Sequence, residues 1–165
     1  GMHASLYVGY KTNIEKSKSF GYMIPALAFD YKLVPGGQLV LATKIKGHLN
    51  FGNNFEFYQA ASLGASDGLR VYRNQRFTGK NALYQSTDIS LNLRKVKTGL
   101  LPLNIGFYGG FDYGRVWVED DDSNKWHNNV GGSFWVSGFE AFTGNIGYYH
   151  STEGGRIVFT LGFEF

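Results

Sequence analysis

The sequence predicts an all-β fold, an antiparallel up-and-down transmembrane β-barrel. Apolar and polar residues alternate along most of the chain, polar turns separate the alternating segments, and no segment shows a helical period. Several segments keep this alternation for about 14 to 16 residues, whereas strands of globular proteins usually have about five or six. A tilted strand needs roughly 9 to 11 residues to cross the hydrocarbon layer of a bilayer, so these segments are long enough to span it.

The composition agrees with this fold class. Aromatic residues make up 17% of the 165 residues and glycine occurs 23 times, whereas charged residues are only 18%. Large rings and tight turns suit many strands better than a helical bundle. Cysteine is absent, which excludes disulfides and thiol chemistry, and a net charge of +3 is too small to indicate nucleic-acid binding.

Four strands are expected in the first part of the chain. Residues 1–2 look like the scar of an expression vector, and residues 4–10 alternate only briefly, so residues 1–19 are expected to hold a scar and a partial or extra strand. The barrel itself is expected over residues 20–165. Its first three strands are predicted at residues 20–33, 38–51 and 55–64, and Pro35-Gly36-Gly37 predicts the first turn.

A long loop follows, over residues 65–81. It reads as neither helix nor strand and carries three arginines in seven residues, Arg70, Arg73 and Arg76. Structureless loops of this length are uncommon in compact domains and usually have a function. Because its arginines need partners, we expect this loop to enter the lumen of the barrel.

Five strands are expected after the loop, at residues 86–94, 103–114, 130–136, 139–150 and 156–165. The polar face of the predicted strands carries charged residues, namely Lys44, Lys46, Asp88, Arg94, Asp112 and Glu164. The opposite face is continuously apolar, which favours contact with lipid. A water-soluble barrel of the lipocalin type, with its apolar face inward, is the alternative. Aromatic residues near strand ends are candidates for interfacial girdles: Phe20, Tyr22, Trp117, Trp126, Tyr148 and Tyr149.

Two motifs carry a resemblance to a known family. Leu69-Arg70-Val71-Tyr72 looks like a Val-Arg-Gly-Phe/Tyr loop motif, with Val71 in place of the glycine, and Phe111-Asp112-Tyr113-Gly114 looks like the matching strand motif two strands later. Both motifs belong to the BamA-type outer-membrane assembly and secretion barrels (bacterial surface antigen). Five strands after the loop and a terminal Phe165 also resemble the C-terminal barrel region of that family.

The resemblance implies a set of site residues. In the family the motif arginine reaches an acid in the lumen, and Asp112 lies on the polar face by parity, so Arg70 is expected to pair with Asp112 in a bidentate geometry. The loop motif would comprise Leu69, Arg70, Val71 and Tyr72, and its partners Phe111, Asp112 and Gly114. Phe159, Leu161, Phe163 and Phe165 would form a C-terminal signal for the assembly machinery.

Nine predicted strands leave the size of the barrel open, because single-chain bacterial barrels have even numbers. Either eight strands from residue 20 close on themselves, or the chain is the C-terminal half of a barrel of about sixteen strands, a number implied by the resemblance.

The implied location is the bacterial outer membrane, and the implied role is protein insertion or translocation. Membrane lipid, assembly machinery and client proteins are the expected partners, and the alternative is a passive anchor for a soluble or enzymatic domain. No nucleic acid, cofactor, metal or catalytic residue is expected.

Overall fold

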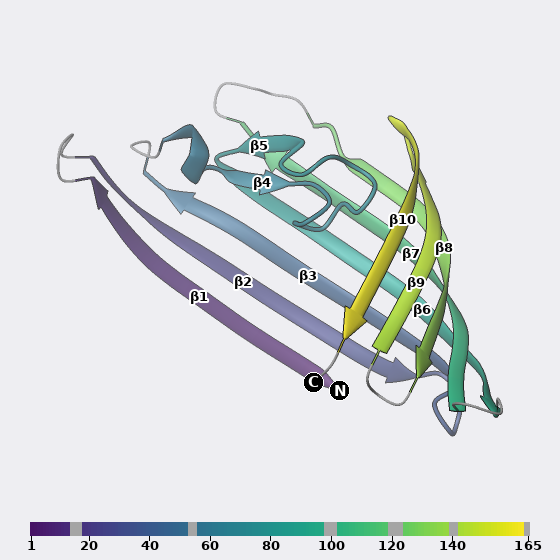
Figure 1. The fold of residues 1–165 in the computed structure, drawn as a ribbon. Helices are drawn as coiled ribbons and strands as arrows, with labels where there is room; N and C mark the ends of the chain where they lie inside the picture. Colours follow the sequence, from purple (N-terminus) through teal and green to yellow (C-terminus); the bar gives the residue numbers. More distant parts are fainter. Residues whose placement is uncertain (14–17, 53–55, 98–101, 119–123, 139–141, 164–165) are drawn as a thin grey trace.

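The computed structural model describes residues 1–13, 18–52, 56–97, 102–118, 124–138 and 142–163. Eight long strands form one antiparallel up-and-down sheet, in which each strand pairs with the next long strand along the chain (Figure 1). These strands are β1 (Met2–Asn13), β2 (Lys18–Lys32), β3 (Leu39–Phe51), β6 (Asn81–Lys97), β7 (Pro102–Trp117), β8 (His127–Gly138), β9 (Phe142–Ser151) and β10 (Gly154–Phe163). The all-β, up-and-down class is therefore confirmed. Within the described residues, no helix has the length and hydropathy to span a bilayer.

The sheet is strongly curved but open. In the described residues β1 pairs only with β2 and β10 only with β9, so these two strands are the free edges. An eight-stranded barrel closed on itself, one of the two expected arrangements, is thus not formed. Eight strands enclose just enough space for their own side chains. Here the hollow of the sheet holds the long connection between β3 and β6 instead (Figure 1).

Two element assignments from the sequence are corrected. The segment 55–64, expected to be a strand of the barrel, contains the short 3₁₀ helix η1 (Phe57–Gln59) and β4 (Ala61–Leu63). β4 pairs with β5 (Phe77–Gly79) in a separate two-stranded sheet, so the long loop extends over residues 52–80 rather than 65–81. Residues 4–10, expected to be a partial or extra strand, lie within β1, which is a full strand that pairs with β2 along its whole length.

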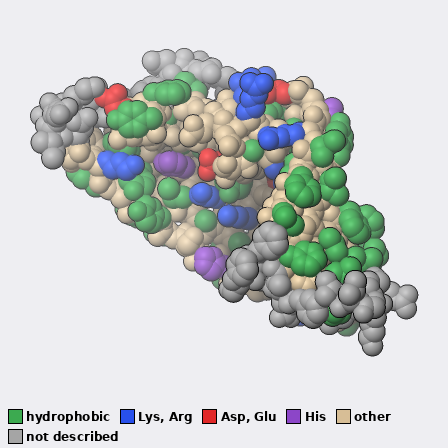
Figure 2. Space-filling view, viewed as in Figure 1, with side chains coloured by type: hydrophobic (Ala, Val, Ile, Leu, Met, Phe, Trp, Pro, Cys, Tyr) green, Lys and Arg blue, Asp and Glu red, His purple; other side chains and the backbone are tan. Residues whose placement is uncertain are grey.

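The two faces of the sheet differ in chemistry, as the alternation predicts. One in-register row crosses six strands of the convex face with apolar side chains: Leu39, Leu91, Phe107, Phe134, Ile146 and Phe159. Since side chains alternate along a strand, the next residues point to the concave face. One concave row contains Ala28, Lys44, Ser86, Asp112, Asn129 and Ser151. Charged side chains gather in the hollow seen in Figure 2.

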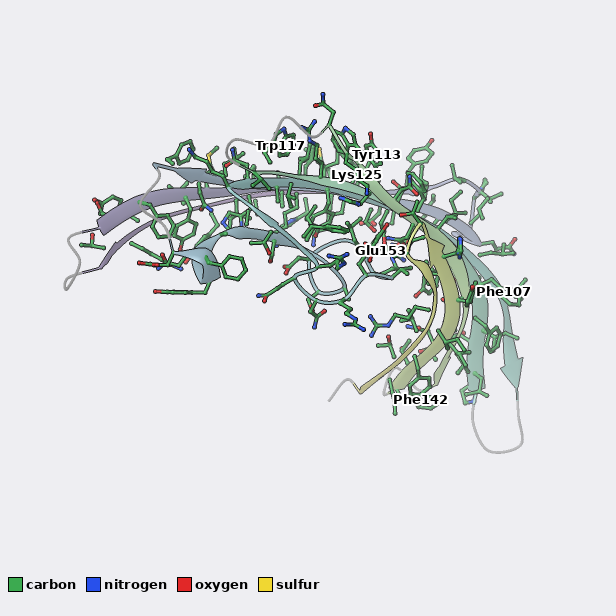
Figure 3. All side chains as sticks on the ribbon, turned by 90° about the horizontal axis from the view of Figure 1, so that it is seen from above. Phe107, Tyr113, Trp117, Lys125, Phe142 and Glu153 are labelled. Atoms are coloured by element: carbon green, nitrogen blue, oxygen red, sulfur yellow. The ribbon has the colours of Figure 1, made fainter. Side chains whose placement is uncertain are left out.

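Aromatic residues are concentrated on the convex face at one end of β7. Tyr113 and Trp117 project from this face in Figure 3. The Tyr113 and Trp126 rings stack with their centroids 4.3 Å apart, and Trp117 meets Trp126 edge-on at 6.2 Å. Arg115 lies over the Trp117 ring, 5.0 Å from its centroid. Two of the girdle candidates from the sequence, Trp117 and Trp126, lie in this group.

The other girdle candidates divide between the faces. Tyr148 is exposed on the convex face, whereas its neighbour Tyr149 is fully buried on the concave side. Phe20 is also buried, and Tyr22 alternates to the concave side with it. Tyr149, Phe20 and Tyr22 therefore lie on the concave side, away from the convex face on which a girdle is expected.

Candidate functional site

The loop between β3 and β6 is held against the concave face by an apolar cluster. Leu63, Leu69 and Tyr72 of the loop are almost completely buried. They pack with Ala61 and with Ala82 and Tyr84 of β6, and Phe77 and Val116 border the cluster. Burying a side chain of this size contributes about 1.5–3 kcal/mol. The loop therefore has its own small core, with the sheet as one wall.

Two glycines allow the loop to approach the sheet closely. Gly68 has φ +103°, a conformation that disfavours any side chain, and a Cβ atom there would collide with the Tyr84 ring. On β7, a Cβ atom at Gly114 would lie 3.1 Å from Leu63 Cδ1 and 3.0 Å from Tyr84 Cβ. The glycine of the strand motif thus makes room for Leu63 of the loop.

Arg70 forms the centre of the site. Its Nε donates to Asp112 Oδ2 at 2.7 Å and its Nη2 to Asp112 Oδ1 at 2.6 Å, which is a bidentate ion pair. The backbone N–H of Arg70 also donates to Asp112 Oδ2, at 3.3 Å. Further bonds from the guanidinium reach Asp88 (2.8 Å), Ser86 (2.7 Å) and the Tyr149 hydroxyl (3.1 Å). We call Arg70, Ser86, Asp88, Asp112 and Tyr149 the Arg70 network.

The network joins one loop cation to three strands of the sheet. Asp112 is completely buried, whereas the side chains of Arg70 and Asp88 are 21% and 34% exposed. Burial lowers the pKa of Arg70, but the hydrogen bonds and negative charges of Asp112 and Asp88 outweigh it and raise that pKa above its usual value. Arg70 therefore remains a cation at any physiological pH, and the buried carboxylate of Asp112 is neutralised by it.

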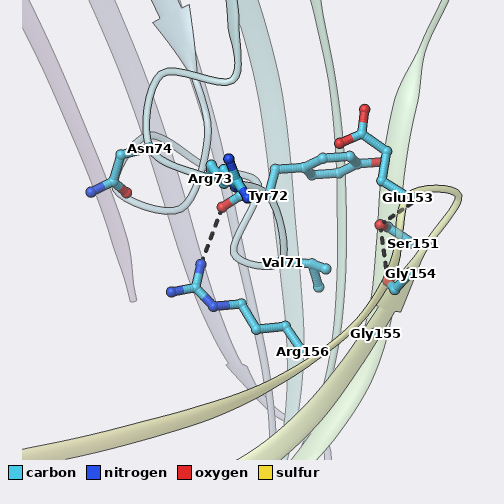
Figure 4. Close-up of a pocket in the computed structure, with 9 residues that line it drawn as sticks. All are labelled: Val71, Tyr72, Arg73, Asn74, Ser151, Glu153, Gly154, Gly155 and Arg156. Carbon is cyan, nitrogen blue, oxygen red and sulfur yellow. Dashed lines mark hydrogen bonds between the residues drawn. The ribbon is translucent and has the colours of Figure 1, made fainter.

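A second set of contacts connects the loop tip to β8, to the β9–β10 turn and to β10; the contact with Arg156 of β10 is drawn in Figure 4. The Tyr72 hydroxyl donates to the Asn128 carbonyl at 3.0 Å, and Arg156 of β10 donates to the Tyr72 carbonyl at 3.4 Å. Arg76 forms an exposed ion pair with Glu153 at 2.9 Å. Between the tip and the β9–β10 hairpin lies a cleft of about 440 Å³, lined in part by Val71 and Arg156. The loop thus contacts the sheet from β6 to the free edge strand β10.

Most predicted site residues lie together. The contact between Arg70 and Asp112 is present with the expected bidentate geometry, and Leu69 and Tyr72 lie beside it in the loop core. Val71 stands where the family's loop motif has glycine. It is 9% exposed and does not displace the loop tip from the sheet.

Other predicted residues lie elsewhere. Phe111 points away from the loop, exposed on the convex face, so grouping it with Asp112 and Gly114 is corrected. Phe159 and Leu161 are exposed on the convex side of β10, and the backbone of Phe163, in the same strand, pairs with Phe142 of β9. Phe165 lies outside the described residues.

Three members of the network were not predicted. Ser86 and Asp88 share the polar face of β6, and the alternation of the sequence predicts that face for both. Nothing in the sequence assigns them to Arg70. Tyr149 was expected at a membrane interface. Its ring instead lies 4.9 Å from the Arg70 guanidinium carbon, a distance at which a cation interacts with a ring.

The Arg70 network is a set of ion pairs and hydrogen bonds. Within the described parts of the chain, no group of three or more His, Cys, Asp or Glu side chains is arranged to hold a metal ion. The network neutralises a buried charge and fixes the loop, since a bidentate pair restricts orientation as well as distance.

Comparison of the chain with family models, with curated proteins and with solved structures gives no match. The resemblance to BamA-type barrels therefore stays an expectation from the two sequence motifs.

Gly110 tests the packing of the network. A Cβ atom there would collide with Asp88 Oδ1 and would lie 2.7 Å from Arg70 Nη1. Gly110→Ala should therefore destabilise the protein by about 1–3 kcal/mol, as overpacking does. Adjacent Gly109 is a matched control, because its Cβ would meet nothing closer than 3.8 Å on the other face. Urea unfolding followed by tryptophan fluorescence measures both. Equal stability of the two variants would contradict this account of the site.

Proposed function

We propose that this chain forms half of the wall of a BamA-type outer-membrane barrel, in a protein that inserts or translocates other proteins. The observation that carries the proposal is the Arg70 network. A loop arginine bound to an acid two strands further along on the concave face agrees with what the resemblance implies, a motif arginine that reaches an acid in the lumen.

The surface of the sheet supports a membrane location. Large apolar side chains are exposed on the convex face of every long strand from β1 to β10, among them Leu6, Phe29, Phe107, Ile146 and Phe159. Contiguous exposed apolar surface of this extent is rare in water-soluble monomers. The concave face is polar around the Arg70 network and carries the loop core at Ala82 and Tyr84, and alternation of an apolar outer with a more polar inner face is the pattern of transmembrane strands.

The open edges bear on the number of strands. An unpaired strand edge in lipid leaves backbone groups without partners, at several kcal/mol for each group. Further strands must therefore pair with β1 and with β10 in the membrane. A barrel of about sixteen strands, the number that the resemblance implies, has room inside for the loop that this sheet carries.

A reconstitution experiment tests this function. The full-length protein that contains this chain is inserted into phosphatidylcholine vesicles, and an unfolded small outer-membrane barrel is added as client. We expect the client to fold faster than in protein-free vesicles, because an inserting barrel lowers the barrier to entry into the bilayer. The folded fraction is measured over time by heat-modifiable mobility on gels, with heat-inactivated protein as the control.

The possible outcomes separate the alternatives. A protein that floats with the vesicles but leaves the folding rate of the client unchanged is a passive anchor. A protein that remains monodisperse without detergent and does not float with vesicles is not a membrane barrel, and both readings are then wrong.

A further inference from the structure

A groove interrupts the apolar convex face near the middle of β7 and β8. Gly109 and Gly132 pair directly across these strands, so two adjacent positions of the outer surface have no side chain. The groove has a volume of about 620 Å³, and the side chains around it are mostly apolar: Phe107, Phe134, Ile146, Tyr148 and Ile157. This volume falls within the range of about 300–1,000 Å³ that is usual for ligand sites.

Nothing inside the chain requires a glycine at position 109. Its φ is not positive, and a Cβ atom would make only one ordinary contact, 3.8 Å from the Gly131 carbonyl oxygen. By contrast, a Cβ atom at Gly106, Gly110, Gly131 or Gly147 would collide with neighbouring atoms of the sheet. A glycine inside a strand costs about 0.5–1 kcal/mol relative to alanine. Such a glycine often marks a place where a ligand or another backbone comes close.

The surroundings of the groove indicate an apolar, elongated occupant. Phe107 and Phe134 form one wall, with ring centroids 5.3 Å apart, and the exposed side chains of Ile146 and Tyr148 extend that wall along β9. The aromatic and cationic group at Tyr113, Arg115 and Trp117 lies on the same face of β7. Gly109 is four residues from Tyr113, which corresponds to about 13 Å along a strand. A lipid whose headgroup lies beside these residues can therefore extend an acyl chain into the groove.

We propose that the groove between Phe107, Phe134 and Tyr148, over Gly109 and Gly132, is a binding site for one acyl chain of a membrane lipid. The inference rests on the proposed membrane location but not on an insertase activity. Bound there, the chain fills the missing side-chain volume of the outer surface and covers the backbone of β7 and β8.

Photolabelling tests the site. The full-length protein is reconstituted in phosphatidylcholine vesicles with a small fraction of phosphatidylcholine that carries a diazirine on its acyl chain. After irradiation, labelled residues are mapped by peptide mass spectrometry. We expect label at Phe134, Ile146 and Tyr148 to exceed, several-fold, label at the equally convex Leu27 and Ile45. Gly109→Leu, which fills the groove, should reduce groove labelling several-fold.

Ile89→Leu is the matched control, because Ile89 lies in the same row on β6 and the exchange preserves volume. It should leave groove labelling unchanged. Uniform labelling of the convex face in the wild-type protein, a result that depends on no variant, would overturn the inference. Weaker labelling of the groove residues than of the rest of the convex face would also overturn the inference, because a protein surface would then cover the groove. A convex face without any label would instead contradict the membrane location.

Discussion

Replacing Arg70 by alanine should lower the free energy of unfolding by about 3–5 kcal/mol, the usual cost of removing one partner of a buried ion pair. Asp112 is completely buried and would retain only the Ser86 hydroxyl and the backbone N–H of residue 70 as donors. Asp112→Ala should cost less, because the Arg70 side chain is 21% exposed and keeps Asp88, Ser86 and Tyr149 as partners.

A double-mutant cycle on Arg70→Ala and Asp112→Ala measures the interaction itself. We expect a coupling energy of about 1–3 kcal/mol, as for residues in direct contact within one network. Arg76→Ala is the control from the same loop. Its ion pair with Glu153 has side chains that are 48% and 42% exposed, so its loss should cost at most about 1 kcal/mol. Additive single-mutant effects, or equal costs for Arg70→Ala and Arg76→Ala, would refute the central role of the network.

The second large effect is expected on the convex face. Phe107→Arg should cost about 2–4 kcal/mol in a bilayer, as an arginine does near the midplane on the lipid face of a barrel. Phe107 lies near the centre of β7, is 50% exposed and points outward (Figure 3). In water an exposed arginine at this position would be nearly neutral. The measurement is urea unfolding of the protein reconstituted in vesicles.

Two controls isolate the contribution of lipid. Phe107→Leu removes the ring contact with Phe134 without adding a charge, so the difference between the two variants gives the cost of the charge. Ser90→Ala changes the concave side of the neighbouring strand and should have little effect. If Phe107→Arg were no more costly than Phe107→Leu, the convex face would be exposed to water, and the membrane location would be wrong.

Much of the site could be predicted from the sequence, because the alternation of side chains along a strand is a local property. Alternation has a period of two and is a property of the chain itself, so it assigned Asp112, Ser86 and Asp88 to one face before any partner was known. The motif resemblance then connected Arg70 with Asp112. The sequence did not predict the contact of Tyr149 with Arg70 or the close contacts at Gly110 and Gly114. These contacts depend on how closely the loop approaches the sheet.

The sequence by itself determined the fold class, the two faces of the sheet and most of the long strands. Only the tertiary structure decided which extended segments pair with which. Residues 61–63 and residues 4–10 both alternate. The first pair with β5 in a loop sheet, where Leu63 packs beside Gly114 of β7, and the second lie in a full edge strand. Closure was also beyond the sequence. It depends on whether the hydrogen-bonding edges of β1 and β10 meet through long-range pairing, which no local pattern encodes, and in the described residues they do not.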